Sequence, residues 1–335
     1  MLRLILALVG TLIAVLLVAP RVIPLLHRLK FGQTIYDLGP ESHKAKQGTP
    51  TMGGLVFALA ATAVALVLGR FHSLWDMGLA VIVFAALSMA IGFADDFIKV
   101  VRKRSLGLVW WQKVLGQVAI GLLFSLYCYH NPAIGSRIVV PFVAVQWDLG
   151  PAYVPLMTLF IMFMINSANL QDGLDGLLSG VAASGGVAWS VLSLLAALAL
   201  LPGVDTQATG SYLNVALFNL ALVGGCLGFL WFNFYPAKVF MGDTGSMWIG
   251  GAAVATAMVL RLPLLMLLIN FTMILSSGSV ILQRVYFKVT KGKRIIKMSP
   301  IHHPFELSGM SEPQIVAMYT AVTTVLSLVA ALSIL

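Results

Sequence analysis

Asp95 and Asp96 stand side by side in the stretch GFADDF, at the end of a long apolar run. Adjacent carboxylates repel each other, and a charge at the bilayer centre costs roughly 2.5–3.5 kcal/mol on insertion scales. Carboxylates in such a position act as general bases or as partners of a cation and phosphate network. We therefore interpret the pair as functional. The alternative is a solvated helix end followed by snorkelling cations, namely Lys99, Arg102, Lys103 and Arg104.

A second group of polar residues lies in NSANLQDGLDGL, where Asn166, Asn169, Asp172 and Asp175 recur every three residues. A helical continuation would stack them along one face, whereas the two Asp-Gly pairs favour turns. Both arrangements gather two carboxylates and two amides at one place, with no Lys or Arg among them. The Asp spacing does not fit an EF-hand.

The stretch NFYPAKVFMGDTGS contains a third acid, Asp243. Gly242 and Gly245 allow a close approach of the backbone to a ligand, and Thr244 and Ser246 are candidate caps of the following helix. A hard carboxylate oxygen in this setting suits Mg²⁺ beside a phosphate. The alternative is an ordinary Asp-containing turn before a helix.

Two further segments carry hydrogen-bond donors. KQGTPTMGG offers Lys46 and hydroxyl groups to an anion, although this stretch taken alone is better explained by a helix cap and packing glycines. His302 and His303 follow a basic run over 288–297. Since no Cys lies near and the His spacing is not that of a helical zinc motif, we expect these imidazoles to bind phosphate or sugar oxygens. The basic run itself is typical of contact with anionic lipid.

The elements that position these residues are expected to be membrane helices. Of 335 residues, 59% are hydrophobic and 10% are charged, against about 25% charged residues in soluble domains. Cys128 and Cys226 fall in apolar segments and are expected in the core, not in a disulfide or a metal pair. We predict an all-α polytopic integral membrane protein of about ten transmembrane helices, with spans near 2–22, 52–69, 77–94, 112–129, 153–168, 177–201, 212–230, 245–262, 263–286 and 315–335.

The distribution of basic residues predicts the orientation. If the loop after the first helix is cytoplasmic, 17 of the 21 Lys and Arg face the cytoplasm, as the positive-inside rule requires. Both termini then lie outside, and the acids collect at one cytoplasmic face. Outside, only 130–152 is sizeable, and we predict a short hairpin there. No internal repeat is evident, so we expect one domain over 1–335.

Taken in order, GTPTMGG, ADDF, NLQDGLDGL, NFYPAKVFMGDTGS and MSPIHHPFEL resemble the bacterial phospho-N-acetylmuramoyl-pentapeptide translocases, the MraY family of the polyprenyl-phosphate N-acetylhexosamine-1-phosphate transferase superfamily. The resemblance runs essentially end to end. It implies Mg²⁺-dependent transfer of phospho-MurNAc-pentapeptide from UDP-MurNAc-pentapeptide to undecaprenyl phosphate, which gives lipid I and UMP for peptidoglycan. It also implies a multi-pass protein of the bacterial cytoplasmic membrane, an active-site cleft on the cytoplasmic face and a homodimer; no nucleic-acid partner is expected.

The resemblance also implies roles for residues. Asp95 would be the base on the lipid phosphate, or a neighbouring Asp a covalent nucleophile, and Asp243 the Mg²⁺ ligand. The expected catalytic set is Asp95, Asp96, Asp243 and His302. The expected substrate-binding set is Lys46, Thr51, Asn169, Asp172, Gly173, Leu174, Asp175, Asn233, Phe240, Gly242, Ser246, Gln283, His302 and His303, with Phe240 stacking on uracil. The family commonly has a third histidine where this chain has Pro304, which puts in doubt only a role for that third imidazole.

Two other functions compete with this one. The first is a paralogous transferase that passes GlcNAc-1-phosphate from UDP-GlcNAc to the same lipid phosphate; GTPTMGG and the PIHHPFEL loop favour the muramyl-pentapeptide enzyme. The second is an ion-coupled transporter, because acids in membrane helices also mark ion paths. Transporters usually contain repeats and helices broken at the midplane, whereas here the acids are expected at one face.

Overall fold

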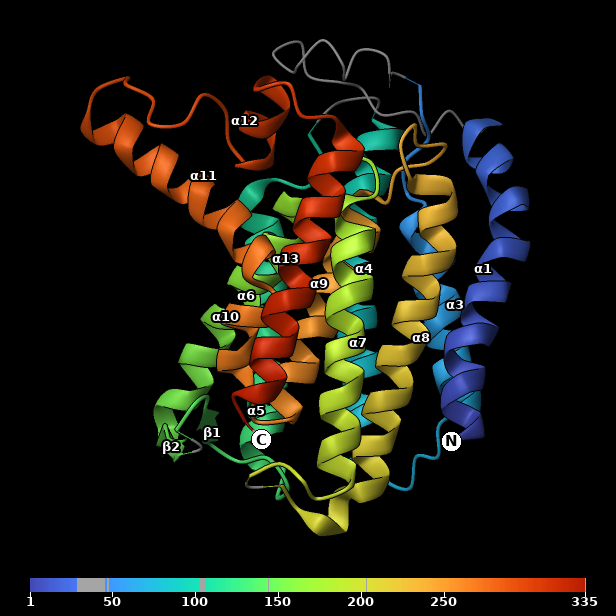
Figure 1. Ribbon diagram of the computed structural model, residues 1–335, viewed down its shortest axis with the longest axis vertical. Helices are drawn as coiled ribbons and strands as arrows, with labels where there is room; N and C mark the ends of the chain where they lie inside the picture. The colour runs from blue at the N-terminus through green and yellow to red at the C-terminus, as the bar shows by residue number, and fades with distance from the viewer. Residues whose placement is uncertain (29–45, 47, 103–105, 144, 203, 335) are drawn as a thin grey trace.

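A computed structural model of the chain describes residues 1–28, 46, 48–102, 106–143, 145–202 and 204–334. The protein is a bundle of helices with one small hairpin at one end (Figure 1). In chain order the elements are α1 (Leu2–Arg28), α3 (Gly54–Leu68), α4 (Met77–Val101), α5 (Trp110–His130), β1 (Arg137–Val140), β2 (Val145–Asp148), η1 (Gly150–Ala152), α6 (Tyr153–Gln171), α7 (Leu177–Ala197), η2 (Thr206–Ala208), α8 (Thr209–Asn233), α9 (Gly242–Val259), η3 (Pro263–Leu265), α10 (Met266–Ile269), α11 (Phe271–Val289), α12 (His302–Leu307) and α13 (Glu312–Leu332).

Within the described ranges, six helices are long and apolar enough to cross a membrane, and a bent pair makes a possible seventh. The six are α1, α4, α6 with η1, α7, α8 with η2, and α13. Each of the ten predicted apolar segments falls on a helix, but α3 has only 15 residues, and α5 and α9 carry more polar residues. The all-helical membrane class is thus confirmed, whereas the number ten stays a prediction.

The segment 263–286, expected as one straight span, is broken. The helices Pro263–Ile269 and Phe271–Val289 meet at an angle of 86°, and α11 leaves the bundle obliquely (Figure 1). The break is at Asn270, whose Oδ1 accepts a hydrogen bond of 3.3 Å from Trp189 Nε1 on α7. This contact joins residues 81 positions apart, so the local pattern of apolar residues does not contain it.

The core is centred on α9, which is buried along nearly its whole length from Thr244 to Val259. It packs against α4 and α6, and small residues bring the helix backbones close together, as in other membrane bundles. At Gly92 of α4 an added Cβ would collide with the backbone of Asp243. This close crossing places the next turn of α4 beside the start of α9.

The predicted hairpin is confirmed: β1 and β2 pair antiparallel, with Arg137 opposite Asp148. Both chain termini lie at the same end of the bundle as the hairpin (Figure 1). The Phe142 amide donates to the Ser333 carbonyl at 2.7 Å, and the Val139 amide donates to the Arg261 carbonyl at 2.8 Å. The hairpin therefore links the ends of α9 and α13. Cys128 and Cys226 are free and buried, as predicted.

Candidate active site

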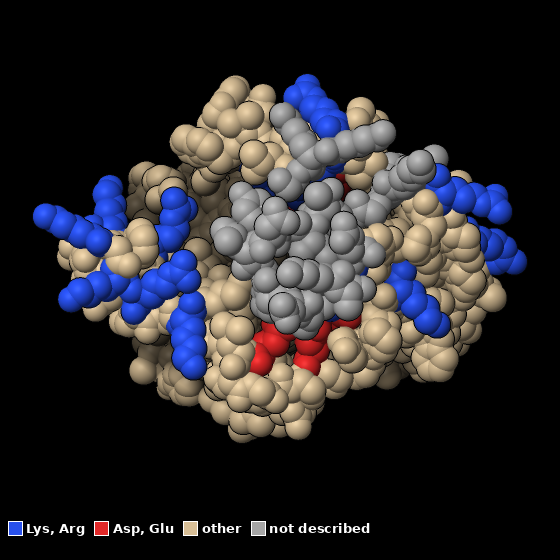
Figure 2. Space-filling model, turned by 90° about the horizontal axis from the view of Figure 1, so that it is seen from above, with Lys and Arg blue, Asp and Glu red and all other residues tan. Residues whose placement is uncertain are grey.

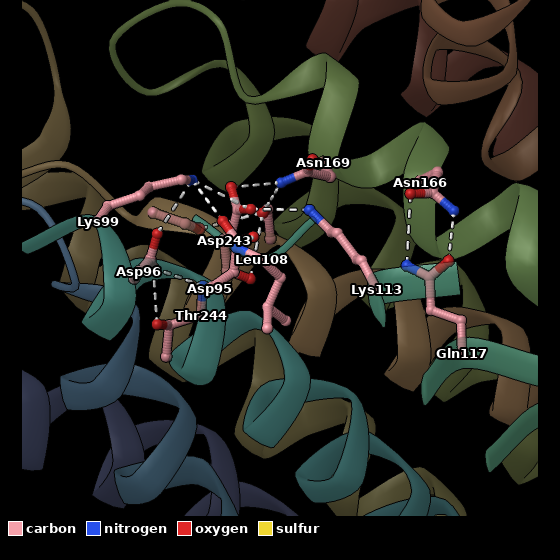
Figure 3. Close-up of polar contacts among 12 residues, drawn as sticks. Asp95, Asp96, Lys99, Leu108, Lys113, Gln117, Asn166, Asn169, Asp243 and Thr244 are labelled. Atoms are coloured by element: carbon pink, nitrogen blue, oxygen red, sulfur yellow. Dashed lines mark hydrogen bonds and ion pairs between the residues drawn. The ribbon is translucent and has the colours of Figure 1, made fainter. Parts of the chain in front are cut away.

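Three carboxylates meet where α4 crosses α9. Asp95 and Asp96 are 4% and 2% exposed on the last turns of α4, and Asp243 lies in the first turn of α9. One oxygen from each lies within 4.8 Å of the others. Figure 3 shows the three side chains pointing toward one another. Asp243 thus lies inside the helix and not in a turn before it, because α9 begins at Gly242, ahead of the predicted start near 245.

Asp243 is surrounded by nitrogen donors. Lys99 Nζ lies 3.3 Å and Lys113 Nζ 2.8 Å from its Oδ2. Asn169 Nδ2 donates to its Oδ1 at 2.8 Å and to the Ser246 hydroxyl at 2.9 Å (Figure 3). Four elements, α4, α5, α6 and α9, therefore converge on this carboxylate, and the two ammonium groups balance most of the local negative charge.

The two adjacent aspartates have different partners. Asp96 Oδ2 accepts from the Thr244 amide at 2.9 Å and from the Thr244 hydroxyl at 2.7 Å. Asp95 Oδ1 accepts from the Leu108 amide at 2.9 Å, and its Oδ2 lies 2.6 Å from Lys99 Nζ. Asp96 is thus fixed to the start of α9. The expectation that Thr244 or Ser246 caps α9 is wrong, because the helix already begins at Gly242. The Thr244 hydroxyl donates to Asp96 and the Ser246 hydroxyl to the Gly242 carbonyl.

Gly242 has a positive φ of 72°, a conformation that costs little only for glycine. A Cβ at this position would lie 2.5 Å from Asp96 Oδ2 and 2.8 Å from Thr51 Oγ1. The absence of a side chain thus lets the 51–54 segment, α4 and the start of α9 meet. The amides of Gly53 and Phe240 complete the contact, by donating to the carbonyls of Phe240 at 2.9 Å and of Pro50 at 2.8 Å.

A second charged cluster lies beside the turn between α6 and α7. Lys46 Nζ is 2.7 Å from Asp175 Oδ1, and 2.7 and 2.8 Å from the two oxygens of Glu312. Burial alone would lower the pKa of Lys46, but the hydrogen bonds to Asp175 and Glu312 outweigh it and raise this pKa above its usual value. Asp175 Oδ2 also accepts from the Ala237 amide at 2.9 Å.

The segment 172–176 forms turns, which decides between the helix and the turn that its sequence allowed. Asn233 supports it from α8: its Oδ1 accepts from the Gly176 amide at 3.2 Å and from the Ser179 hydroxyl at 3.1 Å. Burial and the charges of Asp243, Asp96 and Asp175 raise the pKa of Asp172 to about 8. The protonation of Asp172 therefore depends on the charges of both clusters, through Asp243 and Asp96 in the first and Asp175 in the second.

Of the remaining predicted residues, the histidines lie against the 172–176 turn, whereas the hydrogen bonds that Gln283 accepts come from the loop after α11 and from neither cluster. His302 and His303 are 0% and 8% exposed, with ring centroids 4.4 Å apart, and a Cβ at Gly173 would collide with His302 Nε2. Gln283 Oε1 accepts from the amides of Ile295 and Ile296. Leu174 is buried and Phe240 is half-buried.

The donor set of the first cluster fits a hard divalent cation, because it consists of carboxylate oxygens within a small radius. Figure 2, viewed from this end, shows acidic side chains near the middle of the face and Lys and Arg around its rim. Such an arrangement combines cation ligands with donors for anionic groups, which are the components of phosphoryl-transfer sites.

The five motifs were predicted to lie at one face, and their proximity agrees with that prediction. The contacts of four residues were not predicted: Lys99, Lys113, Thr244 and Glu312. Lys99 had a detectable signal, since it lies three and four residues after the two aspartates on one helix. Lys113 and Glu312 had none, because their partners are 130 and 266 residues away.

The fold and the site define a helical membrane protein with a buried carboxylate and lysine centre at one end. Residues 78–261 match glycosyl transferase family 4, and residues 46–57 match phospho-N-acetylmuramoyl-pentapeptide-transferase signature 1.

Curated relatives match nearly the whole chain. The phospho-N-acetylmuramoyl-pentapeptide-transferase of Clostridium novyi (strain NT) is 43% identical over 96% of this chain and 93% of its own. That of Bacillus subtilis (strain 168) is 45% identical over 94% and 92%, and that of Halalkalibacterium halodurans is 40% identical over 98% and 96%. The chain therefore belongs to the phospho-N-acetylmuramoyl-pentapeptide-transferase family.

Proposed function

We propose that the protein transfers phospho-N-acetylmuramoyl-pentapeptide from its UDP carrier to undecaprenyl phosphate, giving lipid I and UMP in peptidoglycan synthesis. The observation that carries the proposal is the convergence of Asp95, Asp96 and Asp243 with Lys99 and Lys113 at one end of a membrane bundle. Family membership supplies the identity of the two substrates.

In this reaction an oxygen of the lipid phosphate attacks the β-phosphorus of the UDP-sugar. A new phosphoanhydride bond forms, the bond between the α- and β-phosphates breaks, and UMP leaves. Asp95 is the proposed base that takes a proton from the lipid phosphate. Its position near the end of α4 and the hydrogen bond that it accepts from the Leu108 amide support this role. A covalent aspartyl intermediate is the alternative path, and the two differ in whether UMP is released before the lipid binds.

Mg²⁺ is the proposed cofactor, held by Asp243 with support from the neighbouring aspartates, and when bound it would neutralise charge on the phosphate oxygens. Lys99 and Lys113 now pair with Asp243. Their ammonium groups lie where they can turn to diphosphate oxygens once that carboxylate has another partner. Asp96, fixed by two hydrogen bonds to Thr244, is suited to keep α4 and α9 in register.

The second cluster is the proposed nucleotide end of the site. Its turn between α6 and α7 adjoins Lys46, and Phe240 offers a half-buried ring for uracil. His302 and His303 are proposed to donate to phosphate or sugar oxygens. The full proposed substrate-binding set is Lys46, Thr51, Asn169, Asp172, Gly173, Leu174, Asp175, Asn233, Phe240, Gly242, Ser246, Gln283, His302 and His303.

We further propose one domain over 1–335, ten spans with both termini outside, a site open to the cytoplasm, and a homodimer in the bacterial cytoplasmic membrane. The common end of the two termini and the hairpin supports an even number of crossings. The basic residues around the rim at the opposite end support a cytoplasmic site. Of the basic segments used for orientation, most of the one after α1 and residues 103–105 lie outside the described residues.

UMP release by the purified protein in detergent tests the function. We expect continuous release with UDP-MurNAc-pentapeptide, undecaprenyl phosphate and Mg²⁺ together, and no continuous release when any one is omitted. A single burst of UMP without undecaprenyl phosphate would indicate the covalent path. Preference for UDP-GlcNAc would assign the protein to the paralogous transferase reaction instead. Because no ion gradient exists in detergent, turnover there also excludes a transporter.

A further inference from the structure

Glu312 is a buried acid outside the carboxylate cluster. It is the first residue of α13 and is 6% exposed. Both of its carboxylate oxygens lie within hydrogen-bond distance of Lys46 Nζ, at 2.7 and 2.8 Å. One of them also accepts from the Asp175 backbone amide at 3.0 Å. A single side chain thus holds two separate groups of the second cluster.

The three members of this contact come from distant parts of the chain. Lys46 precedes α3, Asp175 lies between α6 and α7, and Glu312 opens the last helix. Lys46 and Glu312 are 266 residues apart, and Asp175 and Glu312 are 137 apart. No local structure would bring them together, so the position of Lys46 against the 172–176 turn depends on this contact.

The charge balance shows what Glu312 adds. Asp175 alone would neutralise Lys46, and Glu312 adds a second negative charge to a half-buried ammonium. Removing one partner from a buried ionic contact leaves the others incompletely compensated. Without the Glu312 carboxylate, Lys46 keeps one oxygen of Asp175, and the Asp175 amide loses its acceptor.

We infer that Glu312 is a positioning residue for nucleotide recognition, which holds Lys46 and the Asp175 amide in the geometry that the UDP-sugar meets. The inference rests on the proposed function, because it takes the second cluster as the nucleotide end. Glu312 acts through Lys46 and Asp175 and is not a member of the carboxylate cluster. Its loss should therefore affect substrate affinity more than the chemical step.

Glu312→Gln tests this, because it removes the charge with little change of shape. We expect the KM for the UDP-sugar to rise about tenfold while kcat changes less than about twofold. The Kd for UMP, measured by calorimetry, should weaken in parallel. Glu312→Asp, which keeps the charge on a shorter side chain, should recover part of the affinity. Combined with Lys46→Met, Glu312→Gln should add little, because both changes act through one contact.

Gln314→Ala is the matched control on the same helix turn. Gln314 Oε1 accepts from the Ser311 amide at 2.9 Å and supports the start of α13 without contacting Lys46. We expect Gln314→Ala to leave KM unchanged. A rise of KM in this control equal to that in Glu312→Gln would assign Glu312 a structural role and overturn the inference. Full additivity with Lys46→Met, or a kcat loss without a KM change, would overturn it too.

The two proposals fail in different ways. A parent protein that binds UMP but releases none from either UDP-sugar contradicts the proposed function. A parent protein with normal turnover whose affinity for UMP is unchanged by Glu312→Gln contradicts this inference alone.

Discussion

The substitution Asp243→Asn tests the division of roles among the three carboxylates. It keeps an oxygen that can accept from Asn169 but removes the charge that Lys99 and Lys113 face at 3.3 and 2.8 Å. Two unit charges about 4 Å apart attract by about 4 kcal/mol at an effective dielectric constant near 20. The lysines and the cation compete for this carboxylate, so only part of this attraction is lost to the cation. We expect the free energy of cation binding to weaken by about 1.4–2.8 kcal/mol, which corresponds to a roughly 10–100-fold higher Mg²⁺ concentration for half-maximal rate.

The assay is the rate of UMP release as a function of Mg²⁺ concentration, with UDP-sugar binding measured by calorimetry. Asp243→Asn should shift the curve to higher Mg²⁺ and recover part of its rate there. Asp95→Asn should lower the rate by about 10²–10⁴-fold at every Mg²⁺ concentration, the usual contribution of a positioned base. Nucleotide binding should survive in Asp95→Asn, because that contact lies on other loops.

Asp148→Asn provides the matched control, since it makes the same chemical change in an exposed ion pair on the hairpin, at the opposite end of the bundle. It should leave both the rate and the Mg²⁺ requirement unchanged. If Mg²⁺ rescued Asp95→Asn and Asp243→Asn equally, or if Asp95→Asn alone abolished nucleotide binding, the roles would be wrongly assigned.

Three further predictions concern stability, pH and orientation. Gly242→Ala should lower the free energy of unfolding by about 1–3 kcal/mol, because of the positive φ and the crowding at this position, and this should appear as a lower Tm in detergent. Gly210→Ala, which has open space around it, should not lower the Tm. Equal Tm values for the two variants would contradict this prediction. The pKa of Asp172, raised from 3.8 to about 8, means that the folded protein keeps a proton that the unfolded chain releases, so stability falls as pH rises from about 4 to 8. The Tm advantage of Asp172→Asn should therefore grow over this range, and parallel curves would refute it. Lys293→Cys should not react with an impermeant thiol reagent added outside intact cells, whereas Gln146→Cys should react. The reverse labelling pattern would show that the proposed orientation in the membrane is wrong.

The sequence predicted those parts of the structure that depend on local composition. The apolar segments became helices, and 137–148 became a hairpin despite Pro141. The break at Asn270 was not predictable, because it depends on Trp189 of another helix. A bend in an apolar segment cannot be located from the segment's own sequence when the side chain that bonds to the bend lies on another helix.

The candidate site was predictable in its residue types and not in its pairings. Acids, glycines and donors at one face indicated phosphate chemistry before any geometry was known. The pairing of Lys113 with Asp243, and of Glu312 with Lys46, depends on the crossing of helices distant in the chain. Thr244 was expected to cap α9, but it bonds Asp96 instead, because the α4–α9 crossing offers its hydroxyl a buried carboxylate.

The hairpin is connected to the site at the opposite end of the molecule through helices α9 and α13. It is bonded to the carbonyls of Arg261, just beyond α9, and Ser333, just beyond α13, while Asp243 and Glu312 lie in the opposite first turns of these helices. α13 has 21 residues, so it acts as a lever about 32 Å long. A tilt of only about 2° at the hairpin would move Glu312, at the far end of the helix, by about 1 Å. Because Glu312 positions Lys46, the expected consequence is a weaker affinity for the UDP-sugar. We therefore expect a bulky fusion joined close to Ser333 to tilt α13 and to displace Glu312 before it displaces other residues of the site.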